Sequence, residues 1–396
     1  MAGRRRAWRT PVVGLCLLLA SLTGCAGPSG TDAAKAEVQR VLDRRAVALL
    51  HHDEAVYDQT GSPAQYQQLR AMPLASWTYR LTGLHRGGGT ATADAELRYR
   101  VRGYDKAPVT AARTLTLGRT ADGHWYVAAD RPAKKSGQQL WDQGRVAAAQ
   151  GEHSLVLGVG QSGDELRGFA RLADRAVPAV SQAWGTDWSR RVVVLVPDSL
   201  KGMAGLLGSP ASSYRGIAAV TTGEAGGSDR APADRVIVNP EAYAVLGDVG
   251  KQVVLTHETT HVATRAHTDA ATPLWLSEGY ADWIGYLGTG RTAEQAAPEL
   301  ARAVQDGHVP SRLPVDKDFG FSTDAVDLAQ AYEGGWLACR MIADRWGEVR
   351  LGEFYRAVGA HRKRAGAVED ALKKVLGTTP QMFTTQWQDY LRTQLG

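Results

Sequence analysis

Two histidines and a glutamate stand close together in the order H-E-x-x-H, at His257, Glu258 and His261. Each residue of an α-helix turns about 100°, so side chains four positions apart share a face and both imidazoles can reach one metal ion. Glu258 then lies beside the metal and not on it. From there a carboxylate can take a proton from a zinc-bound water, whose pKa the metal lowers toward neutrality. The motif therefore indicates hydrolytic zinc chemistry.

A tetrahedral catalytic zinc requires a third protein ligand, and the sequence offers two candidates. His267 has the offset of the third histidine in H-E-x-x-H-x-x-G-x-x-H, but Thr264 occupies the glycine position, where a β-branched residue resists a sharp turn. Glu278 is favoured because residues 273–287 are predicted to form a second helix. The apolar positions of that helix are Leu276, Tyr280, Trp283 and Leu287.

Glu278 and Asp282 share the other face of this second helix. Glu278 can bind zinc there while Asp282, one turn later, accepts the free N–H of a ligand imidazole and fixes its tautomer. The alternative is a solvated acidic face. Both carboxylates lie among aromatic residues, where an unpaired charge is costly, and this favours the metal-site interpretation.

The elements that must hold these side chains are visible in the flanking sequence. Val249, Val253 and Val254 precede the motif at helical spacing, which predicts an amphipathic, partly buried helix. His257 and His261 continue that helix.

The H-E-x-x-H motif followed by W-L-S-E-G-Y-A-D resembles the gluzincin group of zinc peptidases, and in particular bacterial peptidase MA-like domains, over residues 154–390. The resemblance implies that His257, His261 and Glu278 bind Zn²⁺. It also implies that Glu258 is the general base and that Asp282 orients a ligand. The fold expected from it is α+β, with a zincin-type catalytic domain built from a mixed-sheet lobe and a helical lobe.

Two further segments carry the resemblance. Residues 331–337 resemble the Y-E-x-G segment of zinc aminopeptidases, which makes Tyr332 the candidate that stabilises the oxyanion; the alternative is a buried tyrosine at a helix start, with its hydroxyl bonded locally. Residues 235–240 resemble the edge strand that pairs with substrate, which makes Asn239 a substrate-binding candidate, although it is also a typical turn residue before a proline. No G-x-M-E-N segment is present, so the sequence favours an endopeptidase over an aminopeptidase.

The N-terminus predicts export and lipid anchoring. Arg4, Arg5, Arg6 and Arg9 precede a short apolar run, and Leu22 to Cys25 matches a bacterial lipobox. The run is too short to span a bilayer. We expect cleavage before Cys25, lipidation of its thiol, and attachment to the extracytoplasmic face of the cell membrane.

Charge and cysteine content give no support for a nucleic-acid-binding protein or for a protein held together by disulfides. The chain has 46 basic and 41 acidic residues, and the signal removes four arginines, leaving 42 basic against 41 acidic. A nearly neutral mature protein gives no argument for nucleic-acid binding. Of the three cysteines, Cys16 belongs to the signal and Cys25 to the lipobox, so Cys339 is expected to be a buried free thiol.

The expected organisation is a signal peptide (1–24), a tether (25–30), an α+β domain (31–130), a linker (131–153), a zincin lobe (154–290) and a helical lobe (291–396). In residues 31–130, two helices precede strand-like runs at 77–85, 90–103 and 109–128, a pattern that resembles the ketosteroid-isomerase-like cone. We expect this domain to be a spacer or interaction module.

Together these features favour a lipid-anchored zinc metallopeptidase acting on peptides or proteins. The alternative is a cell-surface binding lipoprotein in which the zincin domain is a non-catalytic scaffold.

Overall fold

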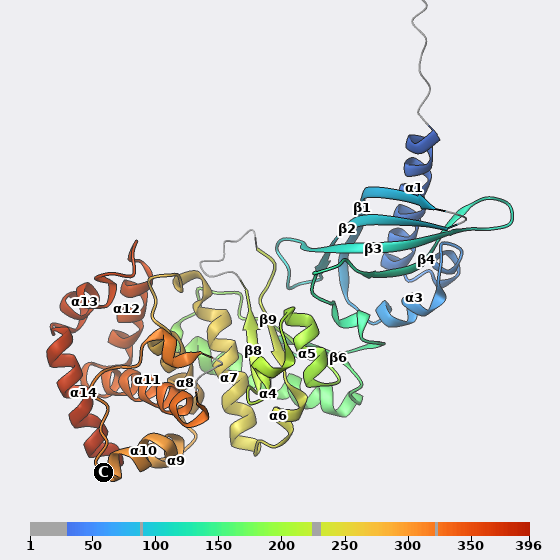
Figure 1. The fold of residues 1–396 in the computed structure, drawn as a ribbon. Coiled ribbons are helices and arrows are strands. Elements are labelled where there is room, and N and C mark those ends of the chain that lie inside the picture. Colours follow the sequence, from blue (N-terminus) through green and yellow to red (C-terminus); the bar gives the residue numbers. More distant parts are fainter. Residues whose placement is uncertain (1–29, 88–89, 224–230, 321–323) are drawn as a thin grey trace, which may run out of the picture.

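The computed structural model of the chain describes residues 30–87, 90–223, 231–320 and 324–396. The predicted signal peptide, the lipidation site Cys25 and the tether up to residue 29 lie outside this part. No helix within the described residues is long and apolar enough to cross a membrane. The predicted α+β class is confirmed: two β-sheets lie beside a helical region (Figure 1).

Residues 30–132 form an N-terminal unit of helices packed on a four-stranded antiparallel sheet in the order β1-β2-β3-β4. The elements are α1 (Gly30–Leu50), α2 (Glu54–Asp58), α3 (Pro63–Leu69), β1 (Leu74–Gly87), β2 (Thr90–Val101), β3 (Val109–Arg119) and β4 (Trp125–Pro132). The sequence predicts only two helices and three strands here. The predicted third strand is wrong because the chain reverses at residues 120–124, where Gly123 N donates to Thr120 O and Thr120 N to His124 O.

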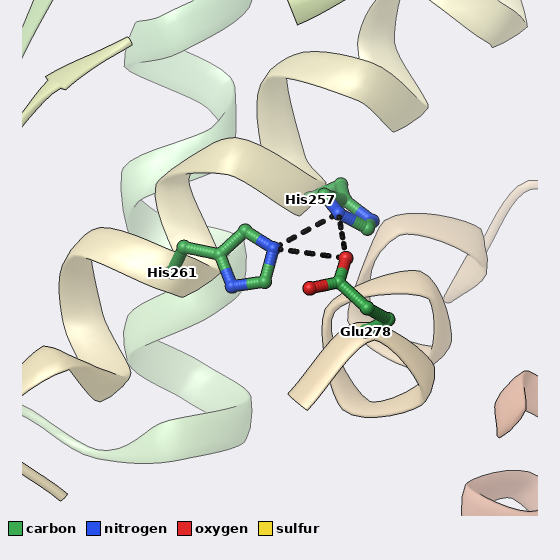
Figure 2. A group of neighbouring side chains, drawn as sticks. All are labelled: His257, His261 and Glu278. Atoms are coloured by element: carbon green, nitrogen blue, oxygen red, sulfur yellow. Dashed lines mark hydrogen bonds and ion pairs between the residues drawn. The ribbon is translucent and has the colours of Figure 1, made fainter. Parts of the chain in front are cut away.

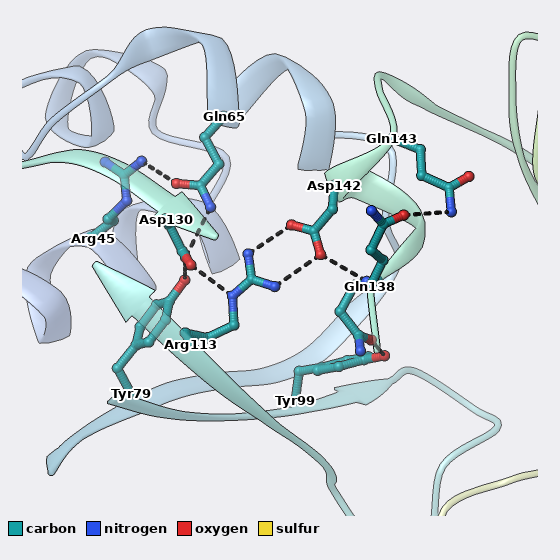
Figure 3. A network of polar contacts seen from close by, with 10 residues as sticks. Arg45, Gln65, Tyr79, Tyr99, Arg113, Asp130, Gln138, Asp142 and Gln143 are labelled. Atoms are coloured by element: carbon teal, nitrogen blue, oxygen red, sulfur yellow. Dashed lines mark hydrogen bonds and ion pairs between the residues drawn. The ribbon is translucent and has the colours of Figure 1, made fainter. Parts of the chain in front are cut away.

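A buried ion network ties this unit together (Figure 3). Arg113 Nε donates to Asp130 Oδ1 at 2.7 Å, and its two terminal nitrogens donate to Asp142 at 2.9 and 2.7 Å. Gln65 and Tyr79 also donate to Asp130. Asp142 belongs to η1 (Leu140–Asp142), the short 3₁₀ helix that follows the N-terminal unit, so the network also anchors the exit of the chain from that unit.

The second sheet has five strands in the order β5-β6-β7-β9-β8. They are β5 (Val146–Gln150), β6 (Ser154–Val159), β7 (Val192–Val196), β8 (Ala219–Thr222) and β9 (Arg235–Val238). Strands β6, β7 and β9 are parallel, whereas β5 and β8 pair antiparallel at the two edges. The stretch 131–153, predicted as a linker, contains the end of β4, η1 and β5, so that prediction is wrong.

The N-terminal unit packs on one face of the second sheet. Trp141 of η1 and the β6 residues Leu155 and Leu157 belong to the same hydrophobic cluster as Trp77 and Leu97 of the first sheet. The other elements around the second sheet are α4 (Gly163–Trp184), α5 (Leu200–Leu207), η2 (Ala211–Tyr214) and α6 (Pro240–Ala244). The sheets are thus joined by a continuous core and not by a flexible connection.

From residue 248 onward the chain is helical. The elements are α7 (Asp248–Thr264), η3 (Arg265–His267), α8 (Leu274–Tyr286), α9 (Ala293–Ala296), α10 (Pro298–Gln305), η4 (Asp316–Phe319), α11 (Ala325–Trp346), α12 (Glu348–Gly359), α13 (Ala367–Ala371), η5 (Leu372–Leu376) and α14 (Pro380–Leu395). Their core includes Tyr280, Trp336 and Phe354, and Cys339 is buried within it as expected. The helix predicted around the H-E-x-x-H motif and the helix predicted at 273–287 are confirmed as α7 and α8.

Candidate metal centre

Helices α7 and α8 pack against each other and carry the predicted ligands. On α7, Val253, Leu255 and Ala263 are buried, which fixes the rotation of the helix and turns His257 and His261 toward α8. Gly285 of α8 allows close approach, because a Cβ there would lie 3.2 Å from both the side chain and the carbonyl oxygen of Val253.

The side chains of His257, His261 and Glu278 converge between the two helices (Figure 2). His257 Nε2 lies 3.0 Å from His261 Nε2. Glu278 Oε2 lies 3.3 Å from the first of these nitrogens and 3.4 Å from the second. Within the described part of the chain, this is the one group of histidine, cysteine and acidic side chains placed to hold a metal ion.

This triangle has the size of one face of a zinc coordination tetrahedron. Zinc–nitrogen bonds of about 2.0–2.1 Å and zinc–carboxylate bonds of about 2.0–2.2 Å place neighbouring ligand atoms about 3.3–3.5 Å apart. The observed edges of 3.0, 3.3 and 3.4 Å are close to that spacing. Two imidazoles and a carboxylate also suit zinc better than magnesium or calcium, which prefer oxygen ligands. The donor set therefore fits zinc.

Asp282 fixes the tautomer of one candidate ligand. Its Oδ1 lies 2.8 Å from His257 Nδ1, and an ionised carboxylate only accepts hydrogen bonds, so Nδ1 carries the proton. The lone pair of His257 is then on Nε2, the atom that faces His261 and Glu278. Asp282 thus lies where the sequence places the orienting carboxylate.

The electrostatics of the cluster favour an added positive charge. Burial lowers the pKa of His257, but the surrounding carboxylates, Asp282 foremost, outweigh burial and hold this pKa well above its ordinary value. Burial raises the pKa of Glu278, yet the neighbouring His261 and His257 hold it well below the usual range. Glu278 therefore stays ionised, and a proton and a metal cation compete for the same nitrogen lone pairs.

Glu258 lies beside the three candidate ligands and is held by the second sheet. Its Oε2 accepts a hydrogen bond of 2.6 Å from the Thr221 hydroxyl on β8, and its side chain is buried. Glu258 is not part of the converging group, so it is free of the role of ligand and available as a base. Thr221 has no recognisable signal in the sequence, because a threonine in a short strand is typical of any sheet.

A cleft of about 600 Å³ adjoins this cluster. His257, Glu258 and Asp282 line it from α7 and α8, Ala219 lines it from β8, and Tyr332 lines it from α11. The cleft is therefore bounded by the sheet edge on one side and by α11 on the other.

Tyr332 lies in the third turn of α11, not at a helix start. Its ring packs edge-on against Phe319 at 5.1 Å, and among the described residues its hydroxyl makes no hydrogen bond. Burial raises the pKa of Tyr332 well above the ordinary value, and Glu278, Asp282 and Glu258 raise it further. The tyrosine is therefore a neutral hydrogen-bond donor directed at no internal partner.

Two glycines set the distance between α11, which carries Tyr332, and α8, which carries Glu278. A Cβ on Gly279 of α8 would lie 2.2 Å from the carbonyl oxygen of Gly335, and a Cβ on Gly335 of α11 would lie 2.7 Å from the carbonyl oxygen of Trp275. The two helices can approach this closely only without these side-chain atoms. The contact lies one residue from Glu278 and three from Tyr332, so it holds Tyr332 of the cleft wall close to the helix that carries Glu278.

The prediction that Asn239 binds substrate is wrong. The side chain is fully buried: Nδ2 donates to the carbonyl oxygens of Tyr214 and Ile217, and Oδ1 accepts from the first backbone N–H groups of α6. Oδ1 caps α6 and Nδ2 holds the chain between η2 and β8, which agrees with the turn-residue alternative. β9 is not an edge strand either, since it pairs with β7 and β8. The edge strand beside the cleft is β8.

His267 lies apart from the converging group. It belongs to η3, beyond the end of α7, and its ring packs edge-on against Trp184 at 5.5 Å. Burial, together with the Arg356 guanidinium, lowers the pKa of His267. Of the two candidate third ligands, the structure brings only Glu278 to the two histidines of the motif.

No family model matches the sequence, and no curated protein matches it. Among solved structures, the native yeast LTA4 hydrolase is 14% identical and covers 71% of this chain and 44% of its own, with a TM-score of 0.39. A mutant M1 zinc metallopeptidase from Deinococcus radiodurans, bound to a Tyr-Ser-Ala substrate, is 15% identical and covers 81% of this chain and 62% of its own, with a TM-score of 0.35. The chain thus spans less than two thirds of the length of these proteins.

Proposed function

We propose that the chain is a zinc-dependent endopeptidase, anchored by a lipid to the extracytoplasmic face of the cell membrane. The observation that supports the activity is the triangle of His257, His261 and Glu278, which matches one face of a zinc tetrahedron, with the buried Glu258 beside it on the wall of an open cleft.

Two residues of the cleft, Glu258 and Tyr332, have defined tasks in the proposed reaction. Zinc, when bound, supplies a Lewis acid that polarises the substrate carbonyl and lowers the pKa of a water. Glu258 accepts a proton from the attacking water and passes it to the leaving amine. The hydroxyl of Tyr332, which has no hydrogen bond within the described residues, donates one to the carbonyl oxygen as negative charge develops there.

The shape of the cleft supports an extended peptide as the substrate. β8 pairs with β9 on one side and lies at the edge of the sheet, so its other side can bind a peptide backbone by main-chain hydrogen bonds. The lining is mostly apolar next to the metal cluster. It includes Val253, Val254, Phe319, Leu328 and Trp336. We therefore expect cleavage next to a large apolar residue.

The anchoring half of the proposal is supported by the lipobox at Cys25 alone. If it is right, the parent protein partitions with membranes, and a Cys25→Ser variant moves to the soluble extracytoplasmic fraction while Glu258-dependent hydrolysis stays intact. Equal partitioning of both forms would contradict lipid anchoring.

The test of the activity is cleavage of a diverse peptide library by the purified parent and by Glu258→Gln, at matched zinc content. We expect internal cuts by the parent that fall by about a hundred- to ten-thousandfold in the variant, since that is the usual contribution of a general base. Glu369→Gln, an exposed carboxylate on α13, is the matched control and should cut like the parent.

The same comparison separates the proposed enzyme from a binding lipoprotein with a zincin scaffold. If both proteins hold zinc and neither cuts any peptide, general peptidase activity is excluded. If cells that carry only Glu258→Gln keep the biological role of the parent, hydrolysis is not that role.

A further inference from the structure

One loop of the N-terminal unit contacts one end of the second sheet. This loop, residues 102–108 between β2 and β3, touches β5, the residue before β7, and β9 at the end where the parallel strands begin. The contacts are Arg191 Nη1 to Gly103 O at 3.3 Å, Gln150 Nε2 to Tyr104 Oη at 2.8 Å, and Arg235 Nη2 to Asp105 at 2.8 and 2.9 Å. These contacts tie the N-terminal unit to the same sheet that carries β8.

Asp105 is the buried centre of this contact. Its side chain is fully buried, and that of Arg235 is only 11% exposed. Asp105 also accepts hydrogen bonds from the backbone N–H groups of Val101 at 2.7 Å and Ala233 at 3.0 Å. One carboxylate of the N-terminal unit thus holds both the guanidinium of Arg235 and the backbone two residues before it.

The segment held by Asp105 is connected to Glu258 through two neighbouring residues of β8. Arg235 begins β9 and pairs with Thr222 of β8, whose hydroxyl lies 3.3 Å from the backbone nitrogen of Arg235. The preceding residue on β8 is Thr221, whose hydroxyl donates to the Glu258 carboxylate at 2.6 Å.

The same segment is attached to the end of α7, the helix that carries His257 and His261. Asp234, between Ala233 and Arg235, accepts a 2.9 Å bond from Arg265 Nε, directly after α7. Residues 233–235 are therefore a junction between the N-terminal unit, the edge strand β8 and the helix that carries His257 and His261.

We propose that Asp105 is a positioning residue of the active site: it fixes the start of β9, and through β9 the strand β8, so that the Thr221 hydroxyl holds the Glu258 carboxylate toward the attacking water. The inference rests on the proposed function. It assigns the N-terminal unit a role in catalysis without direct contact with substrate. A displacement of about 1 Å at a reacting group can cost on the order of a hundredfold in rate, so a small shift of β8 is enough to matter.

The kinetic test is a double-mutant cycle between Asp105→Asn and Thr221→Val. If Asp105 acts through Thr221, each single variant lowers kcat by about tenfold, and the double variant is no slower than the slower single variant. Thr221→Ser, which keeps the hydroxyl, should restore most of the rate, and all variants should keep the parent zinc content. Glu96→Gln is the matched control, because Glu96 pairs with Arg80 on the exposed face of the same unit. Losses that multiply in the double variant would overturn the proposal.

A second measurement does not depend on hydrolysis. Asp105→Asn should increase amide hydrogen exchange in β8 and β9 by about tenfold and leave α11 unchanged, because only the strands lose their anchor. If the parent cuts no peptide, the proposed function fails, and faster exchange in these strands still supports the positional link. Unchanged exchange in β8 overturns the inference whatever the activity.

Discussion

Two buried clusters of charged side chains among the described residues are completed in different ways. Around Arg113, all four carboxylate oxygens of Asp130 and Asp142 accept hydrogen bonds from protein groups (Figure 3). The three side chains are between 0 and 8% exposed. Arg45 donates to Gln65, which donates in turn to Asp130, so a second guanidinium is linked to the network.

The second cluster is neither balanced nor closed. Glu258, Glu278 and Asp282 lie together, and in the described part of the chain no lysine or arginine forms an ion pair with any of them. Two imidazole nitrogens face each other at 3.0 Å (Figure 2). His257 also lines an open cleft. Burial of charge alone therefore does not indicate function. A cluster whose donors and spacing fit a metal ion, and whose carboxylates have no lysine or arginine partner among the described residues, gives a reason to propose one.

Removing a candidate ligand should give the largest effect. His261→Ala is expected to abolish stoichiometric zinc binding and to lower peptide hydrolysis by about a thousandfold or more, because two donors cannot hold a catalytic zinc. The stability of the metal-free protein should hardly change, since His257 remains to pair with both Glu278 and Asp282. Zinc analysis, hydrolysis and thermal unfolding with a chelator measure these three quantities. A clear loss of metal-free stability would make this cluster structural, like the first.

Breaking the Arg113 network should have the opposite effect: the fold loses stability, and zinc binding stays unchanged. Arg113→Met leaves Asp130 and Asp142 buried without their cation, which is expected to destabilise the fold by roughly 3–5 kcal/mol. Zinc content per folded molecule should stay at the parent level. Arg80→Ala, which breaks an exposed ion pair in the same sheet, should cost less than about 1 kcal/mol. Denaturant unfolding measures the stability that each variant loses. Similar losses in the two variants would contradict the difference between the buried network and the exposed ion pair.

The sequence predicts the second cluster far better than the first, because its geometry is local. Spacings of four residues place His257 with His261, and Glu278 with Asp282, on single helix faces, and only the packing of one helix on the other was needed to bring the pairs together. Arg113, in contrast, meets Asp142 across 29 positions and three secondary-structure elements. No periodicity reveals such a partner.

The order of strands in the second sheet could not be predicted for the same reason. Apolar runs locate β6, β7 and β9, but the neighbour of each strand depends on crossovers that the runs do not encode. The sequence therefore predicts β9 as the edge strand where the structure has β8, and the prediction that Asn239 contacts substrate is wrong. The anchor of β9 on Asp105 spans 130 positions and connects two units that the sequence suggested were separated by a linker.

Removing the orienting carboxylate should weaken the metal cluster without destroying it. Asp282→Asn keeps the shape of the side chain but replaces a strong acceptor, so the imidazole of His257 is held less firmly and becomes a poorer donor to metal. We expect zinc affinity to fall by about ten- to a hundredfold, with the same number of sites per chain. Competition against a chromophoric chelator measures the affinity. An unchanged affinity would mean that Asp282 belongs to the solvated face of α8 and not to the site.

Glu333 lies between the two extremes and gives the finest test. It is a half-buried carboxylate on the cleft wall that accepts N–H groups of Glu299 and Leu300, at the start of α10, but forms no ion pair with another described residue. Burial raises its pKa from 4.5 to about 7. Because the folded state binds this proton more tightly than the unfolded state, its contribution to stability is full below about pH 4.5 and is lost as the pH rises through 7.

Glu333→Gln removes that loss, since an amide carries no charge at either pH. Its single oxygen accepts only one of the two N–H groups, which lowers stability equally at both pH values. Relative to the parent, the variant should therefore gain about 1–2 kcal/mol of stability between pH 5 and pH 8, the full shift being reduced for partial exposure. Glu353→Gln, which removes an exposed carboxylate paired with Arg350, should show no such drift. Chemical unfolding of the metal-free proteins at the two pH values measures the difference. A stability difference between variant and parent that is the same at both pH values would mean that the two N–H groups of α10 satisfy the Glu333 carboxylate as completely as Arg113 satisfies Asp130. Glu333 would then resemble the closed network around Arg113.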